Sequence, residues 1–223
     1  MPIEAVIFDM DGVLVDSEVY WAQGRIEYAR DLGKHWGQDD YQLVMGRATL
    51  EWAEVMRERM ELDFDPRQIA DEMIERMRAK YTERLPVRPG AVEAVKLAAS
   101  RYRVGLASGS PTPLIQHVTQ LTGLDKIFEV MVFGDDIPNG KPSPDIYLAA
   151  LQHLGVEPSR AVGIEDSGNG LRSLKAAGMY AIAAPSPDFP LSDEVLSLAD
   201  AHIESMEDFT LELVESLSPQ PPR

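Results

Sequence analysis

The chain has 223 residues, of which 44% are hydrophobic and 26% are charged, so it can bury a core without disulfides. It carries 37 acidic against 21 basic side chains, a formal net charge of −16, which argues against non-specific binding to nucleic acid or to an anionic membrane surface. Cysteine is absent, which excludes disulfides, a thiol nucleophile and cysteine-ligated metals, and which fits a cytoplasmic protein.

Short apolar runs bounded by turn residues predict β-strands along the chain. They occupy residues 5–8, 103–107, 130–133, 161–164 and 180–183, with a further strand expected at 201–203. From residue 103 onward, helical segments alternate with them, at residues 111–121, 144–154, 171–177 and, at the end, around 207–217. Near-continuous apolar strands that alternate with amphipathic helices predict an α/β fold, a Rossmann-like parallel sheet with helices on both faces.

The segment from about residue 17 to residue 85 has a different character, with almost no strand signal. It is rich in Glu, Arg, Met and Ala, and Asp65-Pro66 is typical of a helix start. An apolar stripe at helical spacing follows, formed by Leu62, Ile69, Met73, Ile74 and Met77. We interpret this segment as a helical insert whose methionine-rich stripe forms a bundle core.

Two acidic pairs directly follow predicted strands. Asp9-Met10-Asp11-Gly12 follows the strand at 5–8, and Glu165-Asp166 follows the strand at 161–164. Each pair alone could serve only to cap a turn or a helix. Together they place four carboxylates at the carboxyl ends of parallel strands, where ligands bind in such sheets. Like charges at that spacing require protonation or a shared cation, and oxygen ligands without His or Cys favour Mg²⁺.

Two further strand ends carry groups that suit a phosphate. Ser108-Gly109-Ser110 follows the strand at 103–107 and precedes a helix, so free N–H groups at the helix start and a hydroxyl could hold phosphate oxygens, although a simple helix cap explains it equally well. Gly140-Lys141-Pro142 follows the strand at 130–133 after a short loop. A lysine at this edge can offset the charge of a phosphate and of several carboxylates.

These four strand ends, in this order, resemble the motifs of the haloacid dehalogenase superfamily, in its β-phosphoglucomutase-like and phosphatase branch. Residues 9–17 look like the first motif, and Ser108, Lys141 and Glu165-Asp166 look like the second, third and fourth. The resemblance covers nearly the whole chain. It implies a Rossmann-like core of residues 1–16 and 86–223, an α-helical cap of residues 17–85, and a flexible tail at 218–223.

The resemblance also implies roles for these residues. Asp9 is expected to attack phosphorus and become an aspartyl-phosphate, and Asp11 to protonate the leaving oxygen and then activate water. The metal set is Asp9, Asp11 through its backbone carbonyl, Asp166, and Glu165 through water, with Mg²⁺ as the cofactor. Ser108, Gly109 and Lys141 are expected to bind the phosphoryl group.

Three functions are compatible with these residues. The favoured one is a Mg²⁺-dependent phosphatase that acts on a small phosphorylated metabolite, such as a sugar phosphate. The second is a phosphomutase of the β-phosphoglucomutase kind, but the chain has Trp21 where those enzymes carry a histidine, and Arg47 is shifted by two positions from their cap arginine. The third is a non-enzymatic phosphate-binding or receiver-like module, for which Asp11 has no evident use.

The substrate must be recognised by the helical insert, where single residues are weak signals. The candidates are Glu18, Trp21, Arg25, Arg47 and Lys80, with Asn169 from the core. Each is as easily explained as a solvated or packing side chain. We expect no nucleic-acid partner, because the net charge is strongly negative, and no membrane partner, because no apolar run approaches the roughly 20 residues that span a bilayer. We also expect a monomeric protein.

Overall fold

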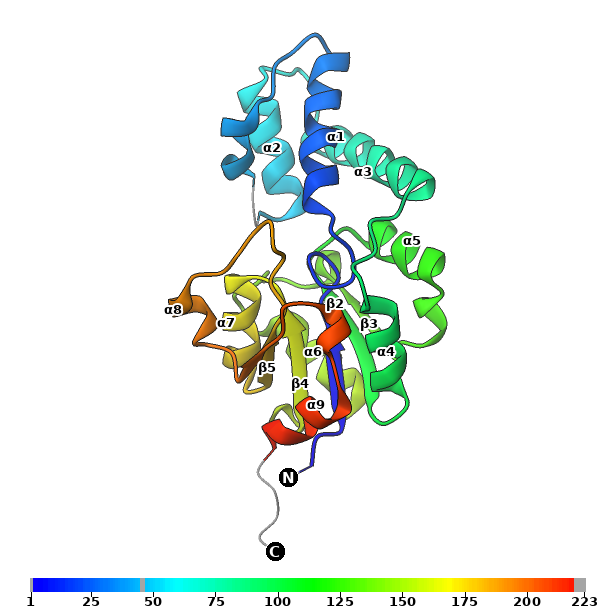
Figure 1. Ribbon diagram of the computed structural model, residues 1–223. Coiled ribbons are helices and arrows are strands. Elements are labelled where there is room, and N and C mark those ends of the chain that lie inside the picture. Colours follow the sequence, from blue (N-terminus) through cyan, green and yellow to red (C-terminus); the bar gives the residue numbers. More distant parts are fainter. Residues whose placement is uncertain (1, 45–46, 219–223) are drawn as a thin grey trace, which may run out of the picture.

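The computed structural model describes residues 2–44 and 47–218 of the chain, and its centre is one parallel sheet (Figure 1). The strands follow the order β3-β2-β1-β4-β5-β6, and all neighbouring pairs run parallel. Their bounds are β1 Ala5–Phe8, β2 Arg103–Ser108, β3 Val130–Phe133, β4 Ala161–Glu165, β5 Tyr180–Ala183 and β6 Ala201–His202. The predicted Rossmann-like sheet is therefore confirmed.

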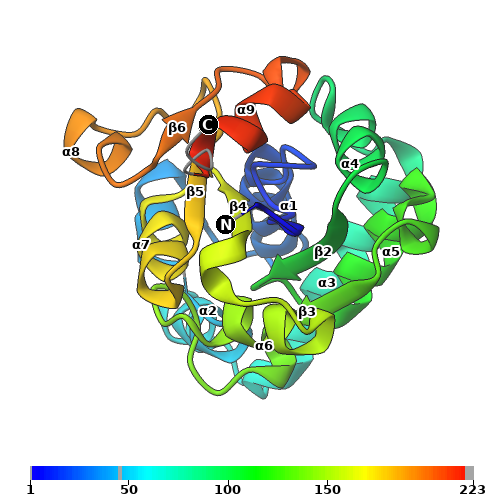
Figure 2. The same cartoon turned by 90° about the horizontal axis from the view of Figure 1, so that it is seen from below.

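Helices cover both faces of this sheet, as Figure 2 shows. One face packs against α4 (Ala91–Ala99), α5 (Thr112–Thr122) and α9 (Leu211–Leu217), and the other against α6 (Asp145–Leu154) and α7 (Gly168–Ala177). A short helix, α8 (Asp193–Leu196), lies beside α7. The strands β1 and β4 are buried along their whole length, which explains why their sequences are apolar without alternation.

Residues between β1 and α4 form a helical unit at one end of the sheet (Figure 1). It contains α1 (Glu18–Asp31), a 3₁₀ helix (Gln38–Leu43), α2 (Thr49–Arg59) and α3 (Pro66–Glu83). Asp65 accepts a hydrogen bond from the Arg67 backbone N–H at 2.8 Å and so caps α3, as its sequence predicts. All five residues of the predicted apolar stripe are buried.

The two connections between the helical unit and the sheet lie side by side. The Asp16 N–H donates to the Pro86 carbonyl at 2.8 Å, and the Arg88 N–H donates to the Leu14 carbonyl at 2.9 Å. Arg88 is buried, and its guanidinium donates to the carbonyls of Gly12 and Ala184. The two connections that attach the helical unit are thus hydrogen-bonded to each other, and Arg88 joins them to the core.

Some elements differ from the sequence prediction. The predicted helix at 207–217 is a 3₁₀ helix, Met206–Asp208, followed by α9, because Thr210 has an extended backbone and caps α9 by accepting from the Leu213 N–H at 3.1 Å. Helices α4 and α8 were not predicted, and β6 ends one residue earlier than expected. The predicted flexible tail at 218–223 lies, apart from Ser218, outside the described residues.

Candidate active site

The carboxyl ends of the strands bring the predicted motif residues together. Phe8 pairs with Ile164 in register, so the residues that follow, Asp9 and Glu165, emerge side by side from β1 and β4. Ser108 ends β2 on the other side of β1. The loop after β3 returns Lys141 to the same edge, where it reaches the carboxylates of both central strands.

Lys141 is the cation at the centre of this cluster. Its Nζ donates to Asp9 Oδ1 at 2.6 Å and to Glu165 Oε1 at 2.5 Å, and all three side chains are at least 86% buried. Asp145 stabilises the loop that carries Lys141. Its carboxylate accepts hydrogen bonds from Ser143 Oγ at 2.7 Å and from Asn139 Nδ2 at 2.9 Å. The loop therefore presents one positive charge between two buried negative ones.

Glu165 uses both of its carboxylate oxygens within the protein. Oε1 accepts from Lys141 and, at 2.7 Å, from the hydroxyl of Tyr147, while Oε2 accepts from the N–H groups of Asp166 and Ser167. Gly170 makes room for this carboxylate, since a Cβ there would lie 1.8 Å from Glu165 Cδ. Because both oxygens of Glu165 are already hydrogen-bonded within the protein, this residue suits an indirect contact with a metal better than a direct one.

Asp9 and Asp166 differ from Glu165 because they retain unbonded oxygens. Among the described residues, Asp166 accepts no side-chain hydrogen bond and Asp9 accepts one only at Oδ1. Oxygens of Asp9, Glu165 and Asp166 lie within 4.8 Å of one another. Gly12, with φ of 73°, lies so close that a Cβ would be 1.8 Å from Asp166 Oδ2. These residues fit a small oxygen-liganded cation such as Mg²⁺.

Burial and mutual repulsion raise the pKa of two carboxylates of the cluster. Burial raises the pKa of Asp9 to about 8, and the carboxylates of Glu165 and Asp11 add to the effect while Lys141 opposes it. Burial, followed by Glu165 and Asp9, also raises the pKa of Asp166. For Glu165 burial acts upwards as well, but the ion pair and hydrogen bond with Lys141 outweigh it and lower the pKa.

Asp11 is held by hydroxyl groups rather than by a cation. Ser17 Oγ donates to Oδ1 at 2.6 Å, and Oδ2 accepts from Ser110 Oγ at 2.6 Å and from Ser108 Oγ at 3.3 Å. The side chain therefore bridges β2 and the first residue of the helical unit. Gly109 is exposed between Ser108, the last residue of β2, and Ser110, where its N–H can reach a ligand.

Sequence reasoning missed three residues of the site. Ser110 and Ser17 lie within the sequence motifs described above, but only the fold shows that the hydroxyls of both reach Asp11. Tyr147 is fully buried, and its hydroxyl reaches Glu165 from the third residue of α6. The sequence signal that could have identified Tyr147 is its position six residues after Lys141, in the predicted helix that follows.

The predicted substrate-contacting residues are distributed unevenly. Glu18 follows Ser17 and accepts a hydrogen bond from the hydroxyl of Tyr41, while Trp21 is buried against Trp52. Arg47 is exposed and donates to the Leu43 carbonyl at 2.6 Å. Lys80 pairs with Glu27 at 2.8 Å on the other side of α1, and Asn169 is exposed in the first turn of α7. Glu18 is adjacent in the chain to Ser17, which contacts Asp11, and Asn169 is adjacent to Gly170, which lies against Glu165.

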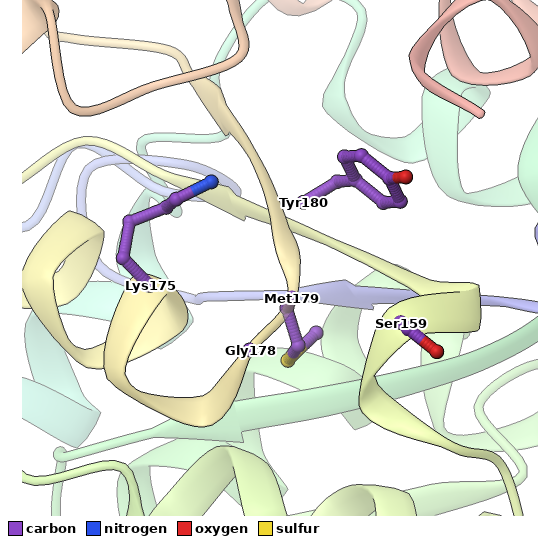
Figure 3. Close-up of a pocket in the computed structure, with 5 residues that line it drawn as sticks. All are labelled: Ser159, Lys175, Gly178, Met179 and Tyr180. Carbon is purple, nitrogen blue, oxygen red and sulfur yellow. The ribbon is translucent and has the colours of Figure 1, made fainter. Parts of the chain in front are cut away.

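Figure 3 shows a separate pocket, lined by Ser159, Lys175, Gly178, Met179 and Tyr180. Residues 159 and 178–180 lie before or at the start of β4 and β5, so this pocket is at the opposite edge of the sheet from the carboxylates. It forms no part of the candidate site. Across residues 2–44 and 47–218, no helix combines the length and apolar character that crossing a bilayer requires.

Known proteins share both the sequence and the fold. A family model for haloacid dehalogenase-like hydrolases matches residues 3–178. "Phosphorylated carbohydrates phosphatase" of Thermotoga maritima is 37% identical over 81% of this chain and 84% of its own length. "Hexitol phosphatase B" of Escherichia coli is 32% identical over 93% of this chain and 95% of its own length.

Solved structures give the same result. CbbY from Rhodobacter sphaeroides, crystallised in complex with phosphate, superposes with a TM-score of 0.86 at 28% identity, covering 96% of this chain and 99% of its own. A putative β-phosphoglucomutase from Thermotoga maritima superposes with a TM-score of 0.78 at 31% identity, covering the same shares. The fold and site define a hydrolase with a Rossmann-like core. The chain belongs to the haloacid dehalogenase-like hydrolases, and the resemblance stated from its motifs is confirmed.

Proposed function

We propose that the protein is a Mg²⁺-dependent phosphatase that hydrolyses phosphorylated carbohydrates through an aspartyl-phosphate on Asp9. The observation that carries the proposal is the contrast between two aspartates two residues apart. Asp9 keeps an unbonded carboxylate oxygen beside Asp166 and Lys141, while both oxygens of Asp11 are held by serine hydroxyls. The names of the relatives supply the substrate class.

The first step uses Asp9 as the nucleophile. Its carboxylate oxygen forms a bond to phosphorus, and the bond from phosphorus to the leaving alcohol breaks. Asp11 donates a proton to that leaving oxygen. Lys141 and the hydroxyl of Ser108, with the N–H of Gly109, position the phosphoryl oxygens and offset their charge.

The second step returns the enzyme to its starting state. A water molecule attacks phosphorus, Asp11 takes the proton of that water, and the bond between phosphorus and Asp9 breaks to release phosphate. Asp9, Asp166 and the backbone carbonyl of Asp11 would hold Mg²⁺, with Glu165 acting indirectly. The metal supplies charge neutralisation for the phosphoryl group.

We propose that residues 17–85 act as a cap that covers the active site. The cap is attached to the core through the two hydrogen-bonded connections at residues 16 and 86. Closing the cap over a bound substrate excludes bulk solvent and strengthens the electrostatic interactions within the site. Tyr41 of the helical unit stacks on Phe189 of the core, with ring centroids 6.2 Å apart and planes inclined by 21°, and this contact supports a closed arrangement. We further propose that the enzyme acts as a monomer in the cytoplasm, in keeping with its lack of cysteine.

A phosphomutase is the second candidate, since one structural neighbour is titled a putative β-phosphoglucomutase. A mutase must retain a bisphosphate and therefore needs a second phosphate site in the cap. Arg47 is exposed and directed to the Leu43 carbonyl, which gives such a site little support. A non-enzymatic regulatory module is disfavoured by membership in a hydrolase family.

The direct test is phosphate release from p-nitrophenyl phosphate and fructose 1-phosphate by the purified protein. We expect activity with Mg²⁺, loss of activity in excess EDTA, and recovery when Mg²⁺ is restored. Full activity in EDTA, with no metal found in the protein by elemental analysis, would contradict the proposal. Conversion of a hexose 1-phosphate to its 6-phosphate without phosphate release would favour the mutase.

A further inference from the structure

Arg25, on α1, is a buried cation without a partner in the described part of the chain. The residue is 6% exposed, its Nε is buried with no hydrogen-bond partner, and no carboxylate lies within 4.0 Å of its guanidinium. Burial lowers the pKa of Arg25 to about 10, with Glu18 and Tyr41 opposing, so it remains charged at neutral pH. A buried charge without a hydrogen-bonded partner is costly, so its retention calls for an explanation, and a ligand that accepts its hydrogen bonds would supply one.

Two tryptophans fix the position of this guanidinium. It lies over the Trp21 ring at 5.0 Å from the centroid and over the Trp52 ring at 5.7 Å, and the two rings meet edge to face. Cation–π attraction acts through the charge of the guanidinium and requires none of its N–H groups as hydrogen-bond donors. Arg25 is therefore held in place without consuming its hydrogen-bond donors.

Arg25 shares one face of α1 with the residue nearest the catalytic cluster. Glu18, Trp21 and Arg25 are spaced i, i+3 and i+7, so their side chains lie along one side of the helix. Glu18 directly follows Ser17, whose hydroxyl donates to Asp11 at 2.6 Å. Arg25 is seven residues further, about 10 Å along the helix axis. This face begins beside Ser17, which contacts the proposed acid/base, and continues along α1 to Arg25.

The charges on this side of the site suit hydroxyl groups rather than a second anion. Glu18 and Arg25 influence each other's ionisation, and the carboxylates of Asp11 and Asp16 also act on Glu18. The carboxylate of Glu18 thus lies on the same helix face as the single arginine, which disfavours a second phosphate or a carboxylate there. A hydroxyl, in contrast, can donate to a carboxylate and accept from an arginine at the same time.

We propose that Arg25, together with Glu18, binds hydroxyl groups of an uncharged, hydroxyl-rich leaving group, so that the preferred substrates are sugar or polyol monophosphates rather than bisphosphates or phosphorylated carboxylic acids. The inference rests on the proposed phosphatase function and assigns the substrate class to residues of this chain. Arg25 contacts the leaving group, and the phosphoryl group itself is bound at the strand ends.

The test compares substrates that differ only in the leaving group. The kcat/KM of the wild type, Arg25→Met and Arg25→Lys is measured on fructose 1-phosphate, fructose 1,6-bisphosphate, 2-phosphoglycolate and p-nitrophenyl phosphate. Methionine keeps the apolar stem between the tryptophans but removes charge and donors, whereas lysine keeps the charge and loses the planar fork. Arg76→Met is the matched control, because Arg76 also lies over an aromatic ring of the helical unit but pairs with Asp31 at 2.7 Å.

The wild type should prefer fructose 1-phosphate to the bisphosphate and to 2-phosphoglycolate. Arg25→Met should lose roughly 10- to 100-fold on fructose 1-phosphate, the effect of one or two hydrogen bonds to a charged group. Its kcat/KM on p-nitrophenyl phosphate, which offers no hydroxyls, should stay within about threefold by the same reasoning. Arg25→Lys should fall between the two, and Arg76→Met should keep the wild-type preference.

Other outcomes would overturn the inference. An equal loss on fructose 1-phosphate and p-nitrophenyl phosphate, in Arg25→Met and in the folded Arg25→Lys alike, would mean that Arg25 only supports the fold. A wild-type preference for the bisphosphate that disappears in the variants would mean that Arg25 anchors a second phosphate. A wild type that releases phosphate from none of the four compounds would instead refute the phosphatase proposal itself, and the inference with it.

Discussion

The strand ends of the sheet and the helical unit above them use charge in opposite ways. At the strand ends, Asp9, Glu165 and Lys141 are buried and joined by bonds of 2.5–2.6 Å. In the helical unit most ion pairs are partly exposed, such as Arg78 with Glu75, and the interior is made of methionine and aromatic side chains. The comparison teaches that the core is built to hold charge for chemistry, whereas the helical unit is built to pack, with Arg25 and Asp40 as buried charged exceptions.

The largest effect should come from Asp11, because it combines proton transfer with a fixed position among hydroxyls. Asp11→Asn keeps the backbone carbonyl and most of the size of the side chain but cannot exchange a proton. We expect the turnover of fructose 1-phosphate to fall by about 10²- to 10⁴-fold. Steady-state phosphate release measures this, and the variant's melting temperature checks its fold. Wild-type turnover in Asp11→Asn would assign the acid/base role elsewhere.

The next largest effect is on the free energy of unfolding, and it distinguishes buried from exposed ion pairs. Lys141→Met leaves two buried carboxylates without their cation, which typically costs about 3–5 kcal/mol. Lys175→Met breaks a partly exposed pair with Asp200 and should cost at most about 1 kcal/mol. Urea unfolding of both variants in EDTA gives the difference. Equal destabilisation would show that burial does not distinguish the two regions.

The smallest effect lies in the helical unit, at Asp40. The Gly37 backbone N–H, at 2.9 Å, lowers the pKa of Asp40, and Arg59, at 2.7 Å, adds to this while burial opposes it. A lowered pKa means that the ionised Asp40 stabilises the fold above its unfolded pKa of about 3.9, and that this stabilisation is lost as pH falls through the lower folded value.

Asp40→Asn should therefore cost about 1 kcal/mol near neutral pH, the contribution of a typical hydrogen bond. The difference from the wild type should shrink as the pH falls below about 4. Melting temperatures measured from pH 7 downwards test this, with Asp39→Asn at the exposed neighbouring residue as the control for net charge. A difference that grows as the pH falls would have the wrong sign.

The same contrast explains how much could be read from the sequence. The strands of the sheet are continuous apolar runs, and the polar residues that follow them must meet at one edge, so the fold and the grouping of Asp9, Lys141 and Glu165 were predictable. The hydroxyls of Ser17 and Ser110 were not, because nothing local marks a serine that reaches across the fold to Asp11. Thr210 similarly interrupts a helical pattern through a cap that only the backbone shows.

In the helical unit, the sequence does not distinguish substrate-contacting residues from packing residues, and the reason is physical. Arg25 and Arg76 both occupy helices rich in charge, and no periodicity distinguishes the arginine that lies over two tryptophan rings from the one that pairs with Asp31. Their difference comes from the packing of α1 against α2 and α3. Substrate recognition was therefore the part of the function least accessible before the structure.

The central claim is that Asp9 carries the phosphoryl group and that Asp11 is needed to remove it. The most direct measurement is acid-quenched mass spectrometry of Asp11→Asn after it is mixed with p-nitrophenyl phosphate and Mg²⁺, with Asp9→Asn as the control. Because p-nitrophenolate leaves without needing a proton, the first step should proceed, and a phosphate should accumulate on the peptide that contains Asp9. An unmodified peptide in Asp11→Asn, or the same modification in Asp9→Asn, would contradict the account.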